Sequence, residues 1–287
     1  MKTGFVGIIG RPNVGKSTLL NAILGEKIAI TTEKPQTTRN AIRGIYTHYS
    51  DDELPEDLQM IFIDTPGIHR PRTKLGSYMT DAAIGTLKEV DAIIFIVDDK
   101  LSDGPGDKYI VDLLDDVVTP KILVINKIDK MQPDEFAEIY KEYEDLGLFE
   151  EIIGVSAKEG THVENVIKEV AQFMEEGPMY FPDDMITEHP ERFVVSEIIR
   201  EKILMYLQDE VPHGVAVEIE QYKEEEKITK IHAVIYCEKK SHKGMIIGKG
   251  GRKLKGIGKS AREEIEVLLG TKVYLELWVK VKENWRD

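Results

Sequence analysis

Eight consecutive residues near the N-terminus have the types and spacing of a phosphate-binding loop. Gly10-Arg-Pro-Asn-Val-Gly-Lys-Ser17 matches the pattern G-x-x-x-x-G-K-[S/T], and it follows an apolar run and opens a helical one. Glycines let successive backbone N–H groups point at phosphate oxygens. Lys16 would place its charge between the β- and γ-phosphates, and the Ser17 hydroxyl would bind Mg²⁺. The nucleotide-binding residues predicted from this loop are Gly10, Arg11, Pro12, Asn13, Val14, Gly15, Lys16, Ser17 and Thr18.

A second nucleotide motif follows the apolar run 60–63. In Asp64-Thr-Pro-Gly67 the carboxylate would hold Mg²⁺ through its water shell, and the Gly67 N–H would meet the γ-phosphate. A D-x-x-G pattern alone is a common turn signal. Its position after a strand and downstream of the phosphate loop adds Asp64, Thr65, Pro66 and Gly67 to the predicted site.

Two further motifs identify the base as guanine. Asn126-Lys-Ile-Asp129 follows the apolar run 122–125, and Ser156-Ala-Lys158 follows the next strand-like run. The Asp129 carboxylate would accept hydrogen bonds from the ring N–H and the exocyclic amine of guanine, a pair of donors that adenine lacks. We expect the stem of Lys127 to cover the base and Asn126 to hold the loop. Ser156, Ala157 and Lys158 would offer a backbone N–H to the guanine oxygen. An ATP-using factor is therefore disfavoured.

The stretch Glu33–Arg39 (Glu-Lys-Pro-Gln-Thr-Thr-Arg) has the character of a nucleotide switch. A mobile loop with a threonine suits this role, because the hydroxyl reaches Mg²⁺ only while the γ-phosphate is present. Thr38 is the first candidate for that hydroxyl and Thr37 the second. Together with Lys16 and Gly67, Thr38 forms the predicted catalytic set.

The side chain that orients the attacking water in fast-hydrolysing GTPases is missing. Those proteins have a glutamine directly after D-x-x-G, whereas this chain has Ile68. His69 and Arg70 lie further along a flexible stretch. We therefore expect slow intrinsic hydrolysis that needs outside help. One source of help would be a monovalent cation held by Asn13 and switch-loop carbonyls, where an arginine finger would otherwise lie.

The composition indicates a soluble protein of two domains. Its 287 residues are 41% hydrophobic and 31% charged, and no run of eighteen apolar residues or secretory signal is present. The single cysteine, Cys237, rules out an internal disulfide and fits a reducing cytosol. The net charge of −14 argues against indiscriminate nucleic-acid binding, so we expect no DNA partner. We also expect a monomer.

Apolar runs alternate with helical patterns over the first part of the chain. The runs are at 60–63, 92–97, 122–125 and 151–155, and the helical patterns lie near 75–89, 107–117, 134–146 and 162–174. This order predicts an α/β domain with a doubly wound, mostly parallel sheet. The acidic segment 50–57 would form a hairpin turn. We assign 1–177 to this GTPase domain, 178–190 to a linker and 191–287 to an α+β domain.

The α+β domain contains a concentrated basic segment. Nine Lys and Arg residues and no Asp or Glu lie between Lys239 and Arg262. Gly248-Lys-Gly-Gly251 is the G-x-x-G pattern with which KH domains approach single-stranded RNA. The predicted order helix, strand, strand, helix, helix, strand is that of a type II KH domain. The predicted RNA contacts are Ile247, Gly248, Lys249, Gly250, Gly251, Arg252, Lys253 and Lys255. A groove for bases would be lined by Ile246, Ile247, Leu254 and Ile257.

The chain as a whole resembles the Era family, in the TrmE–Era–EngA branch of GTPases. The resemblance is carried by the phosphate loop, Pro35–Arg39, Asp64–His69, His189–Phe193, Ile198–Lys202, Ile246–Gly251 and Val273–Val281. It covers essentially the whole chain, although Ser50–Asp57 looks longer than usual. Members of the family also normally continue past the tryptophan at 285 into a short tail.

The resemblance implies a bacterial, cytoplasmic GTPase that binds the 3′ end of small-subunit (16S) ribosomal RNA through its KH domain. Such a protein acts in the assembly of the small ribosomal subunit. The resemblance also implies potassium as the cation near Asn13 and peripheral contact with the inner membrane. As an alternative, the basic domain would dock on a protein or on an anionic membrane surface under the control of GTP.

Overall fold

The computed structural model divides the chain into two compact units, Met1–Glu188 and His189–Asp287. It describes every residue except 33–37, 39, 53, 69–79, 81–82, 86, 88, 104, 208–213 and 284–287, and at 103 and 105 it describes the backbone but not the side chain. Thr37, His69 and Arg70 therefore lie outside the described residues. None of the helices within the described ranges is long and apolar enough to cross a membrane.

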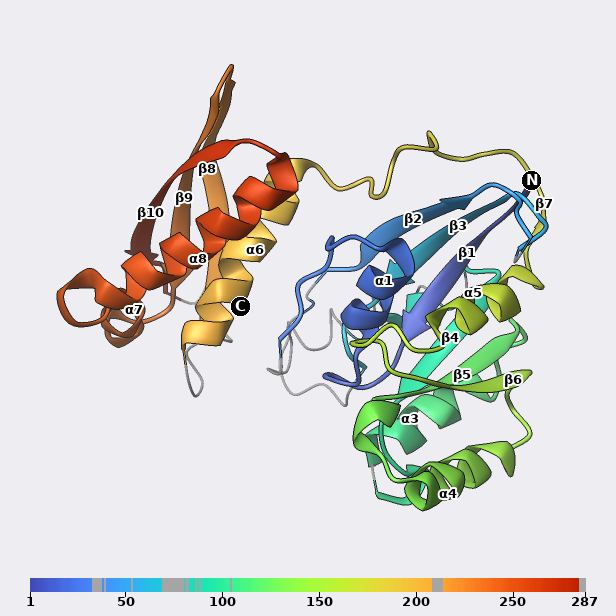
Figure 1. The fold of residues 1–287 in the computed structure, drawn as a ribbon. Helices are drawn as coiled ribbons and strands as arrows, with labels where there is room; N and C mark the ends of the chain where they lie inside the picture. The colour runs from blue at the N-terminus through green and yellow to red at the C-terminus, as the bar shows by residue number, and fades with distance from the viewer. Residues whose placement is uncertain are drawn as a thin grey trace. The chain divides into compact units, whose positions relative to one another are not determined.

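The first unit is built on a sheet whose central strands are buried on both faces (Figure 1). Strand order is β2-β3-β1-β4-β5-β6, with β7 paired to β1. Neighbours from β3 to β6 run parallel, while β2 and β7 pair antiparallel. The strands are β1 (Lys2–Ile9), β2 (Ile42–His48), β3 (Leu58–Asp64), β4 (Ala92–Val97), β5 (Lys121–Asn126), β6 (Glu151–Val155) and β7 (Glu175–Glu176). The predicted parallel sheet is thereby confirmed.

Helices cover both faces of this sheet, as predicted from the alternating pattern (Figure 1). They are α1 (Lys16–Leu24), α3 (Pro105–Leu114), α4 (Pro133–Glu144) and α5 (Val163–Ala171). The predicted helix over 75–89 lies largely outside the described residues. Parallel strands bring their carboxyl ends to one edge, so the loops after β1, β3, β4, β5 and β6 meet there.

Most of the predicted linker 178–190 packs along the first unit rather than crossing open solvent. The fully buried Gln59 accepts hydrogen bonds from the backbone N–H groups of Tyr180 and Phe181, at 2.7 and 2.9 Å. Further on, Thr187 forms an isolated antiparallel bridge with Gly44 of the edge strand β2. The polar composition of the segment resembles that of a free linker, but these backbone groups find partners on the first unit, which ends at Glu188.

The second unit has the predicted α+β order around a three-stranded sheet. Its elements are α6 (Glu191–Tyr206), β8 (Val215–Glu225), β9 (Ile228–Cys237), α7 (Lys240–Ile247), a 3₁₀ turn (Lys249–Gly251), α8 (Arg252–Leu269) and β10 (Lys272–Val281). Strand order is β10-β9-β8, with β10 parallel and β8 antiparallel to β9. Apolar side chains of β9 pack with those of α6 and α8 into one core, which includes Ile231, Ala233, Ile199 and Ile265.

Candidate nucleotide site and basic surface

The phosphate loop connects the end of β1 to the start of α1, as its sequence predicts. A Cβ at Gly15, whose φ is 107°, would lie 2.1 Å from the Asn126 amide nitrogen, so only glycine fits there. The Lys16 ammonium donates to the carbonyl oxygens of Gly10, at 3.0 Å, and Arg11, at 2.7 Å. Burial lowers the pKa of Lys16 to about 8. The loop therefore holds a desolvated cation that a phosphate group would stabilise.

Ser17, Thr38 and Asp64 form a cluster of oxygen atoms next to Lys16. The Ser17 hydroxyl donates to Asp64 Oδ2 at 2.6 Å and lies 2.9 Å from the Thr38 hydroxyl. The other carboxylate oxygen, Asp64 Oδ1, is buried and has no hydrogen-bond partner among the residues that the structure describes. Burial raises the pKa of Asp64 to about 6, although Lys16 and the two hydroxyls oppose the shift. Two hydroxyls and an unpartnered carboxylate oxygen fit Mg²⁺, which takes oxygen ligands.

The remainder of the D-x-x-G motif packs directly against the phosphate loop. Thr65 is held to β1 by a bond from its hydroxyl to the Ile8 carbonyl at 2.8 Å. Gly67 approaches Pro12 so closely that a Cβ would come within 2.6 Å of the Pro12 nitrogen. Ile68 is fully buried in the core, and its N–H donates to the Gly10 carbonyl at 3.0 Å. The side chain at this position therefore cannot orient a water molecule.

The base motifs at the ends of β5 and β6 are tied to each other and to the phosphate loop. The Asn126 side chain donates to the Val14 carbonyl at 2.7 Å and accepts from the Ala157 N–H at 3.0 Å. Asp129 is exposed, and one carboxylate oxygen accepts from the Ser156 hydroxyl at 2.6 Å. This hydrogen bond lowers the pKa of the Asp129 carboxyl. The Asp129 carboxylate is thus an ionised and exposed acceptor, which the two guanine donors require.

Lys127 and Lys158, the two lysines of these motifs, have different surroundings. The Lys127 ammonium donates to the Asn13 carbonyl at 2.8 Å, so the base loop touches the phosphate loop a second time. Lys127 and Asn13 both adopt a left-handed backbone, with φ of 67° at each. Lys158 is exposed and pairs with Glu159 at 3.0 Å.

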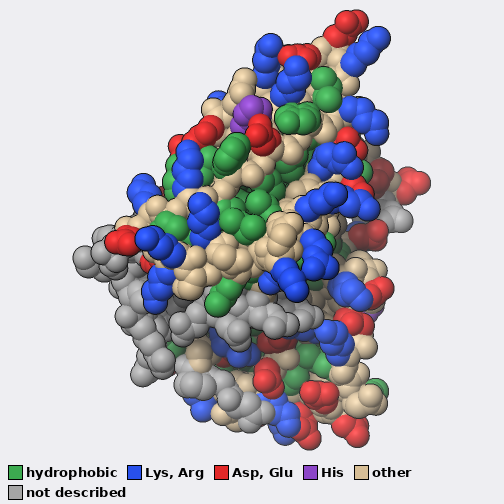
Figure 2. Space-filling view, turned by 90° about the vertical axis from the view of Figure 1, so that its left-hand side faces the viewer, with side chains coloured by type: hydrophobic (Ala, Val, Ile, Leu, Met, Phe, Trp, Pro, Cys, Tyr) green, Lys and Arg blue, Asp and Glu red, His purple; other side chains and the backbone are tan. Residues whose placement is uncertain are grey.

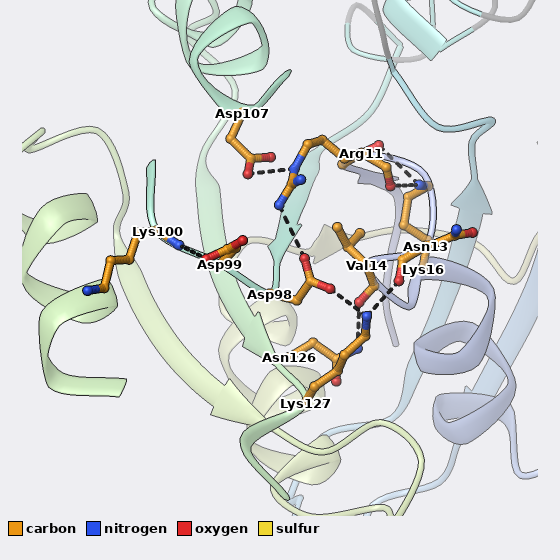
Figure 3. A network of polar contacts seen from close by, with 11 residues as sticks. Arg11, Asn13, Val14, Lys16, Asp98, Asp99, Lys100, Asp107, Asn126 and Lys127 are labelled. Carbon is orange, nitrogen blue, oxygen red and sulfur yellow. Dashed lines mark hydrogen bonds and ion pairs between the residues drawn. The ribbon is translucent and has the colours of Figure 1, made fainter. Parts of the chain in front are cut away.

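The side chain of Arg11 does not join the phosphate cradle. Its guanidinium pairs with Asp98 at 3.3 Å and with the fully buried Asp107 at 2.7 Å (Figure 3). The hydrogen bond between Arg11 and Lys16 uses the Arg11 backbone carbonyl. Neither carboxylate was among the residues predicted from the sequence. Asp98 directly follows the apolar run 92–97, and a carboxylate at the carboxyl end of a parallel strand is the signal that identifies it.

The turn Gly248–Gly251 connects α7 to α8, as predicted. Three of its residues need a left-handed backbone, with φ of 71° at Gly248, 61° at Gly250 and 74° at Gly251. Lys249, Arg252 and Lys255 are exposed and Lys253 is half-buried. Ile247 and Leu254 stay partly exposed beside the turn. The other two residues expected in an apolar groove, Ile246 and Ile257, are instead fully buried in the core, because they form the inner faces of α7 and α8.

The basic segment leaves most of its charge open to solvent. Among its nine Lys and Arg residues, the described ion pairs include one, between Lys259 and Glu263 at 3.7 Å. Figure 2 shows many Lys and Arg side chains on the face of the second unit that it draws, with apolar side chains and fewer Asp and Glu side chains between them. A surface of this kind suits a polyanion whose bases make apolar contacts.

Two family models match the chain in the expected order. Residues 5–127 match the model described as 50S ribosome-binding GTPase, and residues 210–286 match the KH domain model. Similar proteins include GTPase Era of Alkaliphilus oremlandii, which is 62% identical over 100% of this chain and 95% of that protein. GTPase Era of Clostridioides difficile is 57% identical over the same shares of the two chains.

Two solved structures are similar to this chain over its whole length. One is Era in complex with MgGDPNP and nucleotides 1506–1542 of 16S ribosomal RNA, with a TM-score of 0.92 and 40% identity over 100% of this chain and 95% of that chain. Another is a single-residue variant of Aquifex aeolicus Era bound to GDP and AlF4⁻, with a TM-score of 0.91 and 40% identity over 100% of this chain and 96% of that one.

Proposed function

The chain belongs to the Era family of GTPases, so it binds and hydrolyses GTP, and we propose that it uses this cycle to control contact with ribosomal RNA. The KH domain would bind small-subunit (16S) RNA near its 3′ end, in the cytoplasm, during assembly of the small subunit. One observation carries the proposal. The Gly248–Gly251 turn presents an open backbone next to exposed Lys249 and Arg252, in a chain that matches Era bound to that RNA.

The described residues divide the work on GTP between them. Backbone N–H groups of the phosphate loop and the Lys16 ammonium would bind the β- and γ-phosphates. Ser17, Thr38 and Asp64 would hold Mg²⁺, which neutralises phosphate charge when bound. Thr38 lies four residues before β2, so a γ-phosphate that orders its hydroxyl would also fix the start of that strand. This arrangement supports a switch whose conformation depends on whether GTP or GDP is bound.

The side chains near the γ-phosphate would not be sufficient for fast hydrolysis, which would need an additional activator. Ile68 is buried and cannot guide the attacking water. We propose that potassium supplies positive charge near Asn13, an exposed residue of the phosphate loop with a left-handed backbone. RNA bound to the KH domain is the second source of activation in this proposal.

Substitution of Lys249 should weaken binding to an RNA that spans nucleotides 1506–1542 of 16S RNA. RNA affinity should fall with salt with a slope of about −0.7 per phosphate contacted, and Lys249→Gln should reduce that slope by roughly one such contact. Fluorescence anisotropy at several salt concentrations measures both quantities. Lys227→Gln is the matched control, because Lys227 is also exposed but lies in the hairpin between β8 and β9.

The same titration separates RNA from the other partners of a basic surface. A scrambled RNA of equal length and vesicles with anionic lipid serve as competitors. The proposal predicts that only the matching RNA displaces the labelled one efficiently. Displacement by vesicles at lower concentration than by RNA would instead favour peripheral membrane contact, and binding that does not depend on salt would count against the basic surface as the site.

A further inference from the structure

Asp98 connects two nucleotide motifs that are far apart in the sequence. It directly follows β4, in the middle of the sheet edge where the site lies. One carboxylate oxygen accepts from the Arg11 guanidinium at 3.3 Å, and the other forms a short ion pair with the Lys127 ammonium (Figure 3). Arg11 belongs to the phosphate loop and Lys127 to the base loop, so a single carboxylate touches both halves of the site.

The partners of Asp98 are held from other directions as well. The Arg11 guanidinium also pairs with Asp107, which is fully buried near the start of α3. The Lys127 ammonium has the Asn13 carbonyl as a second acceptor at 2.8 Å. Arg11 therefore keeps a strong anchor without Asp98, whereas Lys127 would keep only a neutral carbonyl. The larger consequence of losing Asp98 falls on the base loop.

We propose that Asp98 is a positioning residue for the nucleotide, which holds the Lys127 side chain and the base loop in a fixed relation to the phosphate loop. A guanine nucleotide bridges these two loops when it binds. If the two loops are already held together, the protein loses less conformational entropy when the base and the phosphates bind. The Asp98 side chain is 20% exposed, at the edge of the site, and is not part of the buried core.

Asp98→Asn tests the proposal with little change in shape. The amide keeps the size of the side chain and an oxygen acceptor but loses the charge that pairs with Lys127. We expect affinity for both GDP and GTP to fall about tenfold, mainly through faster dissociation, as expected for loss of a partly exposed ion pair and the order it provides. Release of a fluorescent GDP analogue, chased with excess GDP in the presence of Mg²⁺, measures the dissociation rate.

A double-mutant cycle distinguishes positioning from a general structural role. Lys127→Met keeps an apolar stem for the base but removes the ammonium. If Asp98 acts through that ammonium, adding Asp98→Asn to Lys127→Met should change nucleotide release less than twofold. A loss of tenfold that persists in the Lys127→Met background would overturn the proposal, and so would wild-type release in Asp98→Asn alone.

Asp99→Asn is the matched control for charge. Asp99 is the next residue, is exposed, and accepts from the Lys100 N–H rather than from either loop (Figure 3). The substitution removes the same charge as Asp98→Asn but no contact with either loop, so the rate of nucleotide release should stay within twofold of wild type. An equal loss in Asp99→Asn would show a long-range charge effect and overturn the assignment. Asp98→Glu, which restores the charge, should recover part of the affinity, and thermal unfolding of each variant verifies that it folds.

Discussion

Asp129→Asn should change the base that this protein binds. GTP affinity should fall by roughly a thousandfold or more, because an amide cannot accept both guanine donors and places its own N–H₂ against one of them. Xanthine has an oxygen where guanine has its amine, so the same amide can donate to it while accepting from the ring N–H. Competition of GTP and xanthosine triphosphate against a fluorescent nucleotide measures both affinities.

The structure supports this exchange because Asp129 is exposed and held by the Ser156 hydroxyl at 2.6 Å. An asparagine oxygen can accept the same hydrogen bond, so the loop should keep its shape. Asp134→Asn is the control, because Asp134 is exposed in the first turn of α4, a few residues further along. Unchanged GTP affinity in Asp129→Asn would show that another residue reads the base.

Lys16→Ala should weaken GTP binding severely. Lys16 is the cation that the phosphate loop holds, and removing one member of a desolvated charge pair costs about 3–5 kcal/mol, or a loss of at least roughly a hundredfold in affinity. Lys16→Met, which fills more of the lysine volume, should bind as poorly. Titration with a fluorescent GTP analogue in Mg²⁺ measures the loss.

The loss of binding should not come from loss of folding. The pKa of Lys16 in the folded chain is about 8, below its usual value of 10.5, so the unfolded chain binds more protons between these values and stability rises with pH there. Below pH 8 the buried charge opposes folding, so nucleotide-free Lys16→Met should be at least as stable as wild type at pH 7. A variant that folds and still binds GTP tightly would contradict the assigned role.

The nucleotide motifs could be predicted because they are local. Each is a short pattern after a buried strand, and parallel strands bring their carboxyl ends together whatever the chain does elsewhere. The apolar runs that became β4 and β5 are buried on both faces, so they read clearly as strands. The strand β2 was missed because it lies at the sheet edge, and its buried and partly exposed residues follow neither a continuous apolar run nor a regular alternation.

Contacts between distant residues could not be predicted. Arg11 and Asp98 are 87 positions apart, and nothing near Arg11 shows that its guanidinium turns away from the phosphates. The segment 178–190 was predicted to be a linker, because the buried Gln59, which accepts hydrogen bonds from its backbone, lies more than a hundred positions earlier. Ile246 was expected to line a groove, but it is fully buried in the core. Apolar residues beside a glycine turn can belong to the core or to a surface groove, and the sequence alone does not distinguish the two positions.

Single-turnover GTP hydrolysis, measured with and without the 1506–1542 RNA and in potassium or sodium, tests whether RNA and potassium control the GTPase cycle. A slow switch that lacks a water-orienting side chain should hydrolyse GTP slowly alone. We predict that RNA raises the rate, and that potassium raises it further than sodium does. An equal rate under all four conditions would contradict both the RNA-controlled switch and the cation near Asn13.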